Sequence, residues 1–129
     1  MVIGLGVDVA AIPRVARLVA DHEEDLDRIF TLPERQSCDR GAARRRSARY
    51  ATAFAAKEAV MKAIGTGWRS DIQWNEIDTV TFDRHGGVTL CGGARRAAAA
   101  MGITRVLLTV AVTADLAIAS AVAECNGDA

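Results

Sequence analysis

The stretch from Ala48 to Ile64, ARYATAFAAKEAVMKAI, restricts the fold of this chain more than any other segment. Its apolar residues follow a helical period, and Gly65 and Gly67 come after it, as glycines often do at the end of a helix. Most of its apolar residues are alanines. Side chains this small fill a core only where neighbouring elements approach closely. The segment therefore predicts one long helix in a tightly packed core.

Three charged side chains, Lys57, Glu58 and Lys62, interrupt this apolar helix. At about 100° per residue, Phe54, Glu58 and Lys62 share one stripe of the helix, and small apolar residues occupy a different stripe. One face of the helix is therefore expected to pack and another to carry charge. Taken alone, the spacing of Glu58 and Lys62 is typical of a surface ion pair worth about 0.3 kcal/mol.

A strand is predicted at the N-terminus, where the sequence VIGLGVDV at residues 2–9 alternates in character. One face of this strand is apolar, and Asp8 projects from the opposite face, which is lined by glycine. Asp8 and Glu58 would supply one carboxylate from a strand and one from a helix. Such a pair suits magnesium, which takes few protein oxygens and keeps waters for substrate phosphates. The spacing alone leaves open whether the two side chains meet.

The remaining elements mix helices with hairpins instead of alternating regularly, which indicates an α+β fold. Proline at position 13 suits the first turn of a helix that is expected to end near Phe30. The Thr-x-x-Glu pattern at 31–34 is typical of a capping box and predicts another short helix. We expect one domain over residues 1–129, an antiparallel sheet packed with helices. The other predicted elements are a hairpin over 77–90 that turns at Gly86 and Gly87, a short helix over 94–102, and two strands over 104–113 and 116–124.

Composition argues against several classes of protein. The formal net charge is +0, which argues against a general nucleic-acid binder. No apolar run reaches the length of about 18 residues that a membrane span requires. The arginine-rich segment 40–49 is typical of a solvated surface, or of a surface that docks an acidic partner. The chain has three cysteines, Cys38, Cys91 and Cys125, and they lie in no metal-binding spacing. This pattern favours a reducing cytoplasm.

Three motifs give the chain a family resemblance. GVDVAAIPR at 6–14, FTLPE at 30–34 and FAAKEAVMKAIGTG at 54–67 resemble, in order and separation, the signatures of bacterial holo-acyl-carrier-protein synthases, which are small phosphopantetheinyl transferases. The third motif is the most specific of the three. The likeness continues through HGGVTL at 85–90 and the C-terminal strands, so that it covers nearly the whole chain.

The resemblance implies a homotrimer with active sites between subunits, which moves phosphopantetheine from coenzyme A onto a serine of an acyl carrier protein with magnesium. Asp8 and Glu58 match the metal carboxylates, and Glu58 is also suited to assist proton removal. Lys62 matches a lysine beside the phosphates. Arg14, together with Arg17, matches the basic contact with the carrier protein. The resemblance places Phe54, Gly65, Gly67 and Arg45 on the coenzyme A side of the site.

The chain departs from the family pattern at three positions. Ala53 replaces an arginine, Val88 replaces the proline of a Gly-x-Pro turn, and Val112 replaces a histidine; in the family these positions line the coenzyme A side. Losing a charge-assisted contact costs about 1.5 to 3 kcal/mol, so weaker coenzyme A binding is expected unless Arg44 to Arg46 or Arg49 compensate. Two further hypotheses stay open: a repurposed protein that binds a carrier protein or catalyses different chemistry, and a nucleic-acid binder.

Overall fold

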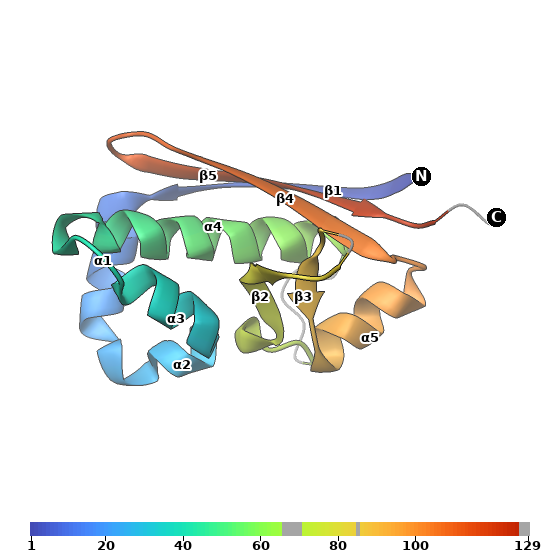
Figure 1. Cartoon of the computed structure of the whole chain (residues 1–129), viewed down its shortest axis with the longest axis horizontal. Helices are drawn as coiled ribbons and strands as arrows, with labels where there is room; N and C mark the ends of the chain where they lie inside the picture. Colours follow the sequence, from blue (N-terminus) through green and yellow to red (C-terminus); the bar gives the residue numbers. More distant parts are fainter. Residues whose placement is uncertain (66–70, 85, 127–129) are drawn as a thin grey trace.

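The structure, a computed structural model, describes residues 1–65, 71–84 and 86–126. Three strands form an antiparallel sheet in the order β1, β5, β4, and helix α4 lies along one face of that sheet (Figure 1). Strands β2 and β3 form a second antiparallel pair. The predicted α+β class, with an antiparallel sheet packed with helices, is confirmed. In chain order the elements are β1 (Val2–Ala11), α1 (Ile12–Asp21), η1 (Glu23–Asp25), α2 (Leu26–Ile29), α3 (Leu32–Asp39), η2 (Ala43–Arg45), α4 (Arg46–Ala63), η3 (Trp74–Glu76), β2 (Ile77–Phe82), β3 (Val88–Leu90), α5 (Gly92–Ala100), β4 (Arg105–Val112) and β5 (Leu116–Glu124).

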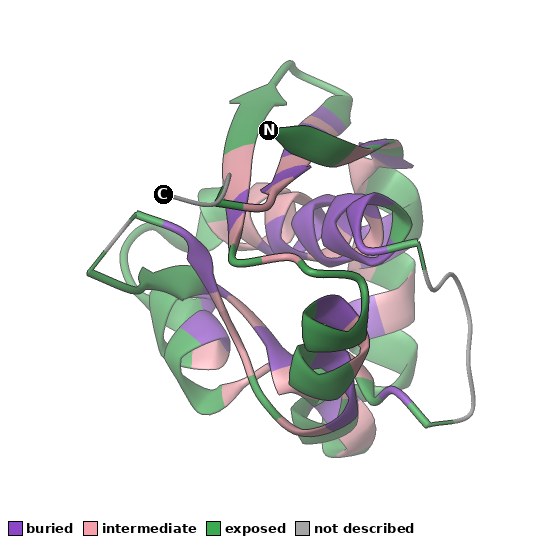
Figure 2. Cartoon of the chain, turned by 90° about the vertical axis from the view of Figure 1, so that its right-hand side faces the viewer, coloured by how far each residue is buried: buried purple, intermediate pink, exposed green. Residues whose placement is uncertain are grey.

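The glycine-lined face of β1 is the face that packs against α4. A Cβ atom added at Gly6 would lie 1.9 Å from the carbonyl oxygen of Ala59, and one added at Gly4 would lie 2.0 Å from that of Ala63. Only glycine on the strand and alanine on the helix allow this separation. The buried residues concentrate on α4 (Figure 2). The tight packing expected from the alanine-rich helix is thus observed.

The apolar face of β1 points away from α4. Its side chains are 37% exposed at Ile3, 68% at Leu5, 56% at Val7 and 53% at Val9. The alternation of the sequence correctly predicted two distinct faces, with Asp8 on the glycine side. It did not indicate that the apolar face would be the one left uncovered by the rest of the chain.

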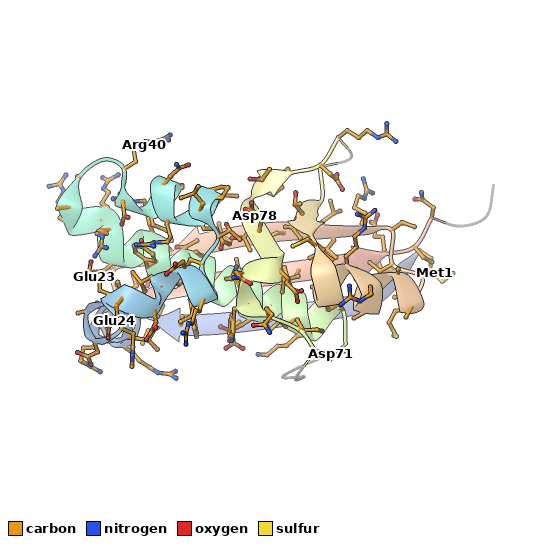
Figure 3. All side chains as sticks on the ribbon, turned by 90° about the horizontal axis from the view of Figure 1, so that it is seen from below. Met1, Glu23, Glu24, Arg40, Asp71 and Asp78 are labelled. Atoms are coloured by element: carbon orange, nitrogen blue, oxygen red, sulfur yellow. The ribbon has the colours of Figure 1, made fainter. Side chains whose placement is uncertain are left out.

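The prediction of one helix from Pro13 to Phe30 was wrong. Helix α1 ends at Asp21, and the short helices η1 and α2 follow. Glu23 and Glu24 lie at the outside of the molecule just after the break (Figure 3). Carboxylates are unfavourable at the C-terminal end of a helix and favourable in a first turn, so the acidic run is better accommodated by a new helical start.

The other predicted elements are confirmed with small changes of boundary. In the capping box of α3, Thr31 Oγ1 accepts a hydrogen bond from Glu34 N at 3.2 Å, and Thr31 N donates to Glu34 Oε1 at 2.8 Å. The hairpin of β2 and β3 turns at Gly86, whose φ is 80°. Strand β5 pairs with both β4 and β1. Among the described residues, no helix is long and apolar enough to cross a membrane.

Candidate active site

Asp8 and Glu58 line the same small cavity, although they come from different elements. The close approach of β1 to α4 brings the two carboxylates to one side of the helix. The cavity has a volume of about 80 Å³, and Arg14 and Phe54 also line it. The structure therefore brings the two carboxylates to one cavity, which the sequence had left open.

Negative charge in this cavity is only partly compensated. The pKa of Glu58 is raised, first by burial and then by the charge of Asp8, while Lys62 and Arg14 act in the opposite direction. Lys62 Nζ donates to Asp8 Oδ1 at 3.2 Å and to the Val7 carbonyl oxygen at 3.0 Å. The predicted Lys62–Glu58 surface pair is thus replaced by a pair with Asp8. Burying two like charges together costs free energy that a cation would recover.

The donor set fits magnesium. Asp8 and Glu58 offer carboxylate oxygens, and the described residues contain no cluster of three or more histidine, cysteine, aspartate or glutamate side chains. An ion held here would complete its shell with water or with substrate oxygens. That is the coordination that magnesium favours beside phosphates.

A stacked aromatic pair stands beside these carboxylates. The rings of Phe54 and Trp74 lie 5.3 Å apart at an angle of 17°. Phe54 lines the cavity of Asp8 and Glu58, so Trp74, from η3, fixes one of its walls. Nothing in the local sequence pattern around Trp74 links it to Phe54, so this contact could not be predicted.

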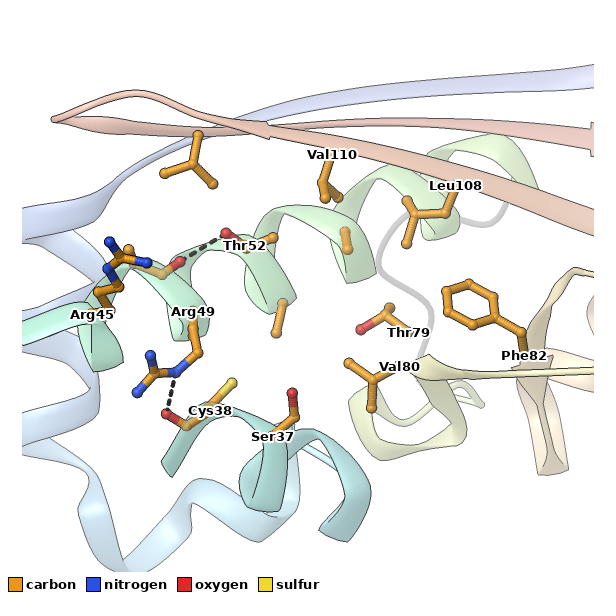
Figure 4. A pocket seen from close by; sticks show the side chains of 14 residues that line it. Ser37, Cys38, Arg45, Arg49, Thr52, Thr79, Val80, Phe82, Leu108 and Val110 are labelled. Atoms are coloured by element: carbon orange, nitrogen blue, oxygen red, sulfur yellow. Dashed lines mark hydrogen bonds between the residues drawn. The ribbon is translucent and has the colours of Figure 1, made fainter. Parts of the chain in front are cut away.

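A larger cavity lies on another side of α4, enclosed by α3, β2 and β4 (Figure 4). Its volume is about 700 Å³. Ala53 and Val112, two of the three positions that depart from the family pattern, both line it. Val88 does not line this cavity and is 5% exposed. The structure therefore brings two of the departures into one cavity, whereas Val88 pairs in the β2–β3 hairpin with Phe82, which lines that cavity. The lining residues are Ser37, Cys38, Arg45, Ala48, Arg49, Thr52, Ala53, Ala56, Thr79, Val80, Phe82, Leu108, Val110 and Val112.

The arginine-rich segment is divided between structural contacts and this cavity. Arg46 donates to Asp39 Oδ1 at 2.8 Å and to Glu23 Oε1 at 3.3 Å, and its guanidinium lies 5.0 Å from the centre of the Tyr50 ring. Arg45 lines the large cavity, and its side chain has no hydrogen bond or ion pair with any residue in the described part of the chain, whereas its backbone N–H donates to the Ala42 carbonyl oxygen at 3.0 Å.

Arg49 also lines the cavity, but part of its guanidinium is engaged in hydrogen bonds. Its Nε donates to the Cys38 carbonyl oxygen at 2.7 Å, and its Nη2 donates to the Ala42 carbonyl oxygen at 3.1 Å (Figure 4 shows the first bond). Arg46 and Arg49 are therefore held in place by the fold. Arg49 keeps its charge and its remaining N–H groups, and Arg45 is the cavity-lining arginine whose side-chain donors are all available.

The remaining predicted site residues are dispersed. Gly65 ends α4 with a φ of 74° and lines a third cavity, of about 260 Å³, with Asp71 and Arg96. Gly67 lies outside the described residues. Arg17 is exposed on α1, whereas Arg14 borders the cavity of Asp8 and Glu58.

Lys57 forms a buried ion pair that no pattern in the sequence indicates. Its Nζ lies 2.7 Å from Glu34 Oε1 and also donates to the Ile77 carbonyl oxygen, and both charged side chains are 0% exposed. Glu34 Oε2 accepts from Thr79 N at 3.0 Å and from Thr79 Oγ1 at 2.5 Å. The pair thus joins α3, α4 and β2. Glu34 was recognised only as part of a capping box, and no local spacing connects it to Lys57.

Comparisons with known proteins place these features in a family context. The sequence profile of the 4'-phosphopantetheinyl transferase superfamily matches residues 4–118. The holo-[acyl-carrier-protein] synthase of Solibacter usitatus (strain Ellin6076) is 38% identical over 127 residues, which cover 96% of this chain and 99% of the relative.

Solved structures of holo-[acyl-carrier-protein] synthases have a fold similar to that of this chain. The holo-[acyl-carrier-protein] synthase of Neisseria meningitidis superposes with a TM-score of 0.80 at 29% identity, covering 96% of this chain and 99% of that one. The synthase of Bacillus anthracis str. Ames in complex with CoA (3',5'-ADP) has a TM-score of 0.72 at 27% identity, covering 98% and 99%.

Proposed function

The chain belongs to the 4'-phosphopantetheinyl transferase superfamily, and from this premise we propose that it moves 4'-phosphopantetheine from coenzyme A onto a serine of an acyl carrier protein, with magnesium. The observation that carries the proposal is the meeting of Asp8 and Glu58 in one cavity beside Lys62. The coenzyme A complex of the related Bacillus anthracis synthase supports the choice of donor.

The residues of this cavity have distinct roles in the proposed transfer. The serine oxygen attacks the phosphorus that carries pantetheine, and the bond from that phosphorus to the 3',5'-ADP oxygen breaks. Glu58 accepts the serine proton, directly or through a water. Its raised pKa brings it nearer the working pH and makes it a stronger base than an ordinary carboxylate. Magnesium bound at Asp8 and Glu58 would neutralise charge on the pyrophosphate.

Lys62 and α1 complete the proposed surroundings of the reaction. The side chain of Lys62 is 50% exposed, so its ammonium can contact a phosphate while it stays beside Asp8. Arg14 borders the same cavity, and Arg17 is exposed on the same helix. An acidic carrier protein that docks on α1 would meet these two charges, which steer association and fix orientation.

We also propose that the chain assembles as a homotrimer. Two features support association. The outer face of β1 is apolar and exposed, with Leu5 and Val7 more than half accessible. The carboxylate cavity and the large cavity lie on different sides of α4, so that one copy can present each to a neighbour. Sedimentation should give a trimer, and replacing both Leu5 and Val7 with lysine should yield monomers. A wild-type monomer at micromolar concentration would contradict the proposal.

The transfer itself is tested by incubating an acyl carrier protein with the enzyme, coenzyme A and magnesium. The intact mass of the carrier protein should increase by one phosphopantetheine. The variant Asp8→Asn/Glu58→Gln should give no increase, because both carboxylates are lost. An unmodified carrier protein with the wild-type enzyme would instead favour a repurposed carrier-binding protein.

A further inference from the structure

Phe54 forms an aromatic wall of the cavity that holds Asp8 and Glu58. It lies one turn before Glu58 on α4, so its ring and that carboxylate share one stripe of the helix. Helix α1 supplies Arg14 and Leu18 to the same cavity. The Phe54 ring therefore borders both the proposed base and the helix on which the carrier protein is proposed to dock. Its orientation sets the shape of the space in which the serine would meet Glu58.

The helix by itself does not fix this orientation. A phenylalanine on a helix has two favourable χ1 rotamers, and Phe54 is only half-buried. The second support is Trp74, whose ring lies 5.3 Å from the Phe54 ring at an angle of 17°. Stacking of this kind is favourable beyond the area that it buries. Among the described residues, Trp74 contacts Phe54 without lining the cavity itself, so any effect of Trp74 on the cavity would pass through Phe54.

The short helix η3, which carries Trp74, is held from two sides. Asn75 Nδ2 donates to the Asp27 carbonyl oxygen of α2 at 3.2 Å. On the other side, Glu76 Oε2 accepts a hydrogen bond from Gly93 N of α5 at 2.8 Å. Side chains that position others must themselves be fixed by such contacts. Trp74 therefore stands on a base that is tied to two further helices.

We propose that Trp74 is a positioning residue for the transfer, because its ring holds the Phe54 ring in place as a wall of the cavity of Asp8 and Glu58. The inference rests on the proposed transferase function and adds a residue to its site. Trp74 keeps the wall beside Glu58 in one orientation, so that the serine approaches the base along one path. A displacement of about 1 Å in a reacting pair can lower the rate about 100-fold. The loss of Trp74 should therefore lower kcat and leave carrier binding nearly unchanged.

The activity test measures kcat, and KM for the carrier protein, at saturating coenzyme A and magnesium. In Trp74→Ala, kcat should fall at least about tenfold. The KM should change less than about threefold, because Arg14 and Arg17 keep their charges. Trp74→Phe retains a ring that can stack and should keep kcat within about threefold of wild type. An unchanged kcat in Trp74→Ala, a loss confined to KM, or equal losses with alanine and phenylalanine would overturn the proposal.

A double variant tests whether Trp74 acts through Phe54. Phe54→Leu removes the ring that Trp74 is proposed to hold, so adding Trp74→Ala to it should cause no further loss of kcat. A further loss as large as that in the wild-type background would show an independent role and refute the proposal. Trp74→Leu keeps apolar bulk without a flat ring, and it provides the same tests should alanine prevent folding.

Phe30→Leu is the matched control. The rings of Phe30 and Tyr50 form another aromatic pair, 5.0 Å apart at 71°, and neither residue lines the cavity of Asp8 and Glu58. This variant should lower the urea midpoint of unfolding and leave kcat unchanged. If it lowered kcat as Trp74→Ala does, general loss of stability would explain both results, and the positioning role would be wrong.

Crystal structures of the wild type and of Trp74→Ala separate this proposal from the function on which it rests. If the wild-type enzyme transfers no phosphopantetheine, the proposed function fails, and the two structures then decide whether Trp74 holds Phe54. A second or different Phe54 rotamer in the variant supports the inference. Phe54 in the wild-type rotamer alone overturns it, because the ring would then keep its orientation without Trp74.

Discussion

Two lysines of α4 form ion pairs of opposite character. Lys57 lies 2.7 Å from Glu34, with both side chains 0% exposed, whereas Lys62 lies 3.2 Å from Asp8, with side chains 50% and 17% exposed. The same type of lysine–carboxylate pair therefore occurs in two different environments. In the interior the pair is fully surrounded by the fold, and its charges are satisfied by neighbouring residues and out of reach of a substrate. At the surface the pair keeps its charges accessible to a substrate.

Position on the helix thus distinguishes a buried charge from an accessible one more clearly than residue type does. The buried network satisfies Glu34 with donors from Lys57, Thr31 and Thr79. Burial lowers the pKa of Lys57, and the Glu34 charge opposes that effect. Removing one member would leave the other charge buried without its partner, which is far more costly than removing an exposed pair.

Breaking the buried pair should give the largest effect. Lys57→Met nearly keeps the length of the side chain but leaves the buried Glu34 carboxylate without its charged partner. We therefore expect the free energy of unfolding in urea to fall by about 3 to 5 kcal/mol. The matched variant Lys62→Met should lose less than about 1 kcal/mol. Equal losses in the two variants would show that burial does not distinguish the pairs.

Glu58 provides the converse case, a charge whose loss should affect catalysis and spare the fold. Glu58→Gln keeps the shape of the side chain but removes the base, so we expect kcat for transfer to fall at least about 100-fold. The free energy of unfolding should not decrease, because burial and Asp8 already disfavour the charged form. Glu24→Gln, at an exposed acid outside the cavity, is the control and should retain full activity. A Glu58→Gln enzyme with normal kcat would exclude Glu58 as the base.

Lys62 should show a smaller catalytic effect than Glu58. Its removal deletes one charge-assisted contact to phosphate, and Lys62→Met should therefore lower kcat/KM by about 10- to 100-fold. Lys62→Arg should restore part of the activity, since it returns the charge. If arginine and methionine were equally inactive, the lysine would act through its shape or its contact with the Val7 carbonyl oxygen.

Local patterns predicted most of the fold. The alternation in residues 2–9, the capping box at Thr31 and the glycine turn at 86 and 87 each determine structure over a few residues, so sequence was sufficient for them. The prediction of one helix over 13–30 was wrong because the pattern of apolar residues continues across an acidic run. Helix α1 ends at that run, and new short helices begin there.

Long-range contacts could be predicted only in part. Asp8 was correctly placed on the glycine face, and that close approach carries it to Glu58. The spacing of residues along the chain gave no sign that Lys57 contacts Glu34. The two residues lie on different helices, α4 and α3, which meet through tertiary packing. The spacing likewise did not show that Ala53 and Val112 share a cavity that Val88 does not itself line.

The smallest expected effect is a pH trend that sharpens the contrast between the two regions. Burial and Asp8 raise the pKa of Glu58 in the folded chain. The folded state therefore holds this proton more tightly than the unfolded state, whose glutamate titrates near about 4.3. The stabilisation from the protonated form is complete below that pH and is lost as pH rises through the folded pKa. Relative to wild type, Glu58→Gln should accordingly gain stability as pH increases from about 4 to 8, by less than Lys57→Met loses.

Urea unfolding across this range, with Glu24→Gln as the control, measures the trend. Because a bound cation favours the ionised carboxylates, magnesium should stabilise the wild type more at high pH than at low pH and should have less effect on Glu58→Gln. If Glu58→Gln instead lost stability relative to wild type as pH rose, the Glu58 carboxylate would be favourably paired in the fold. The Glu58 charge beside Asp8 would then stabilise the fold, as the charge of Lys57 does, and would not need a bound metal to compensate it.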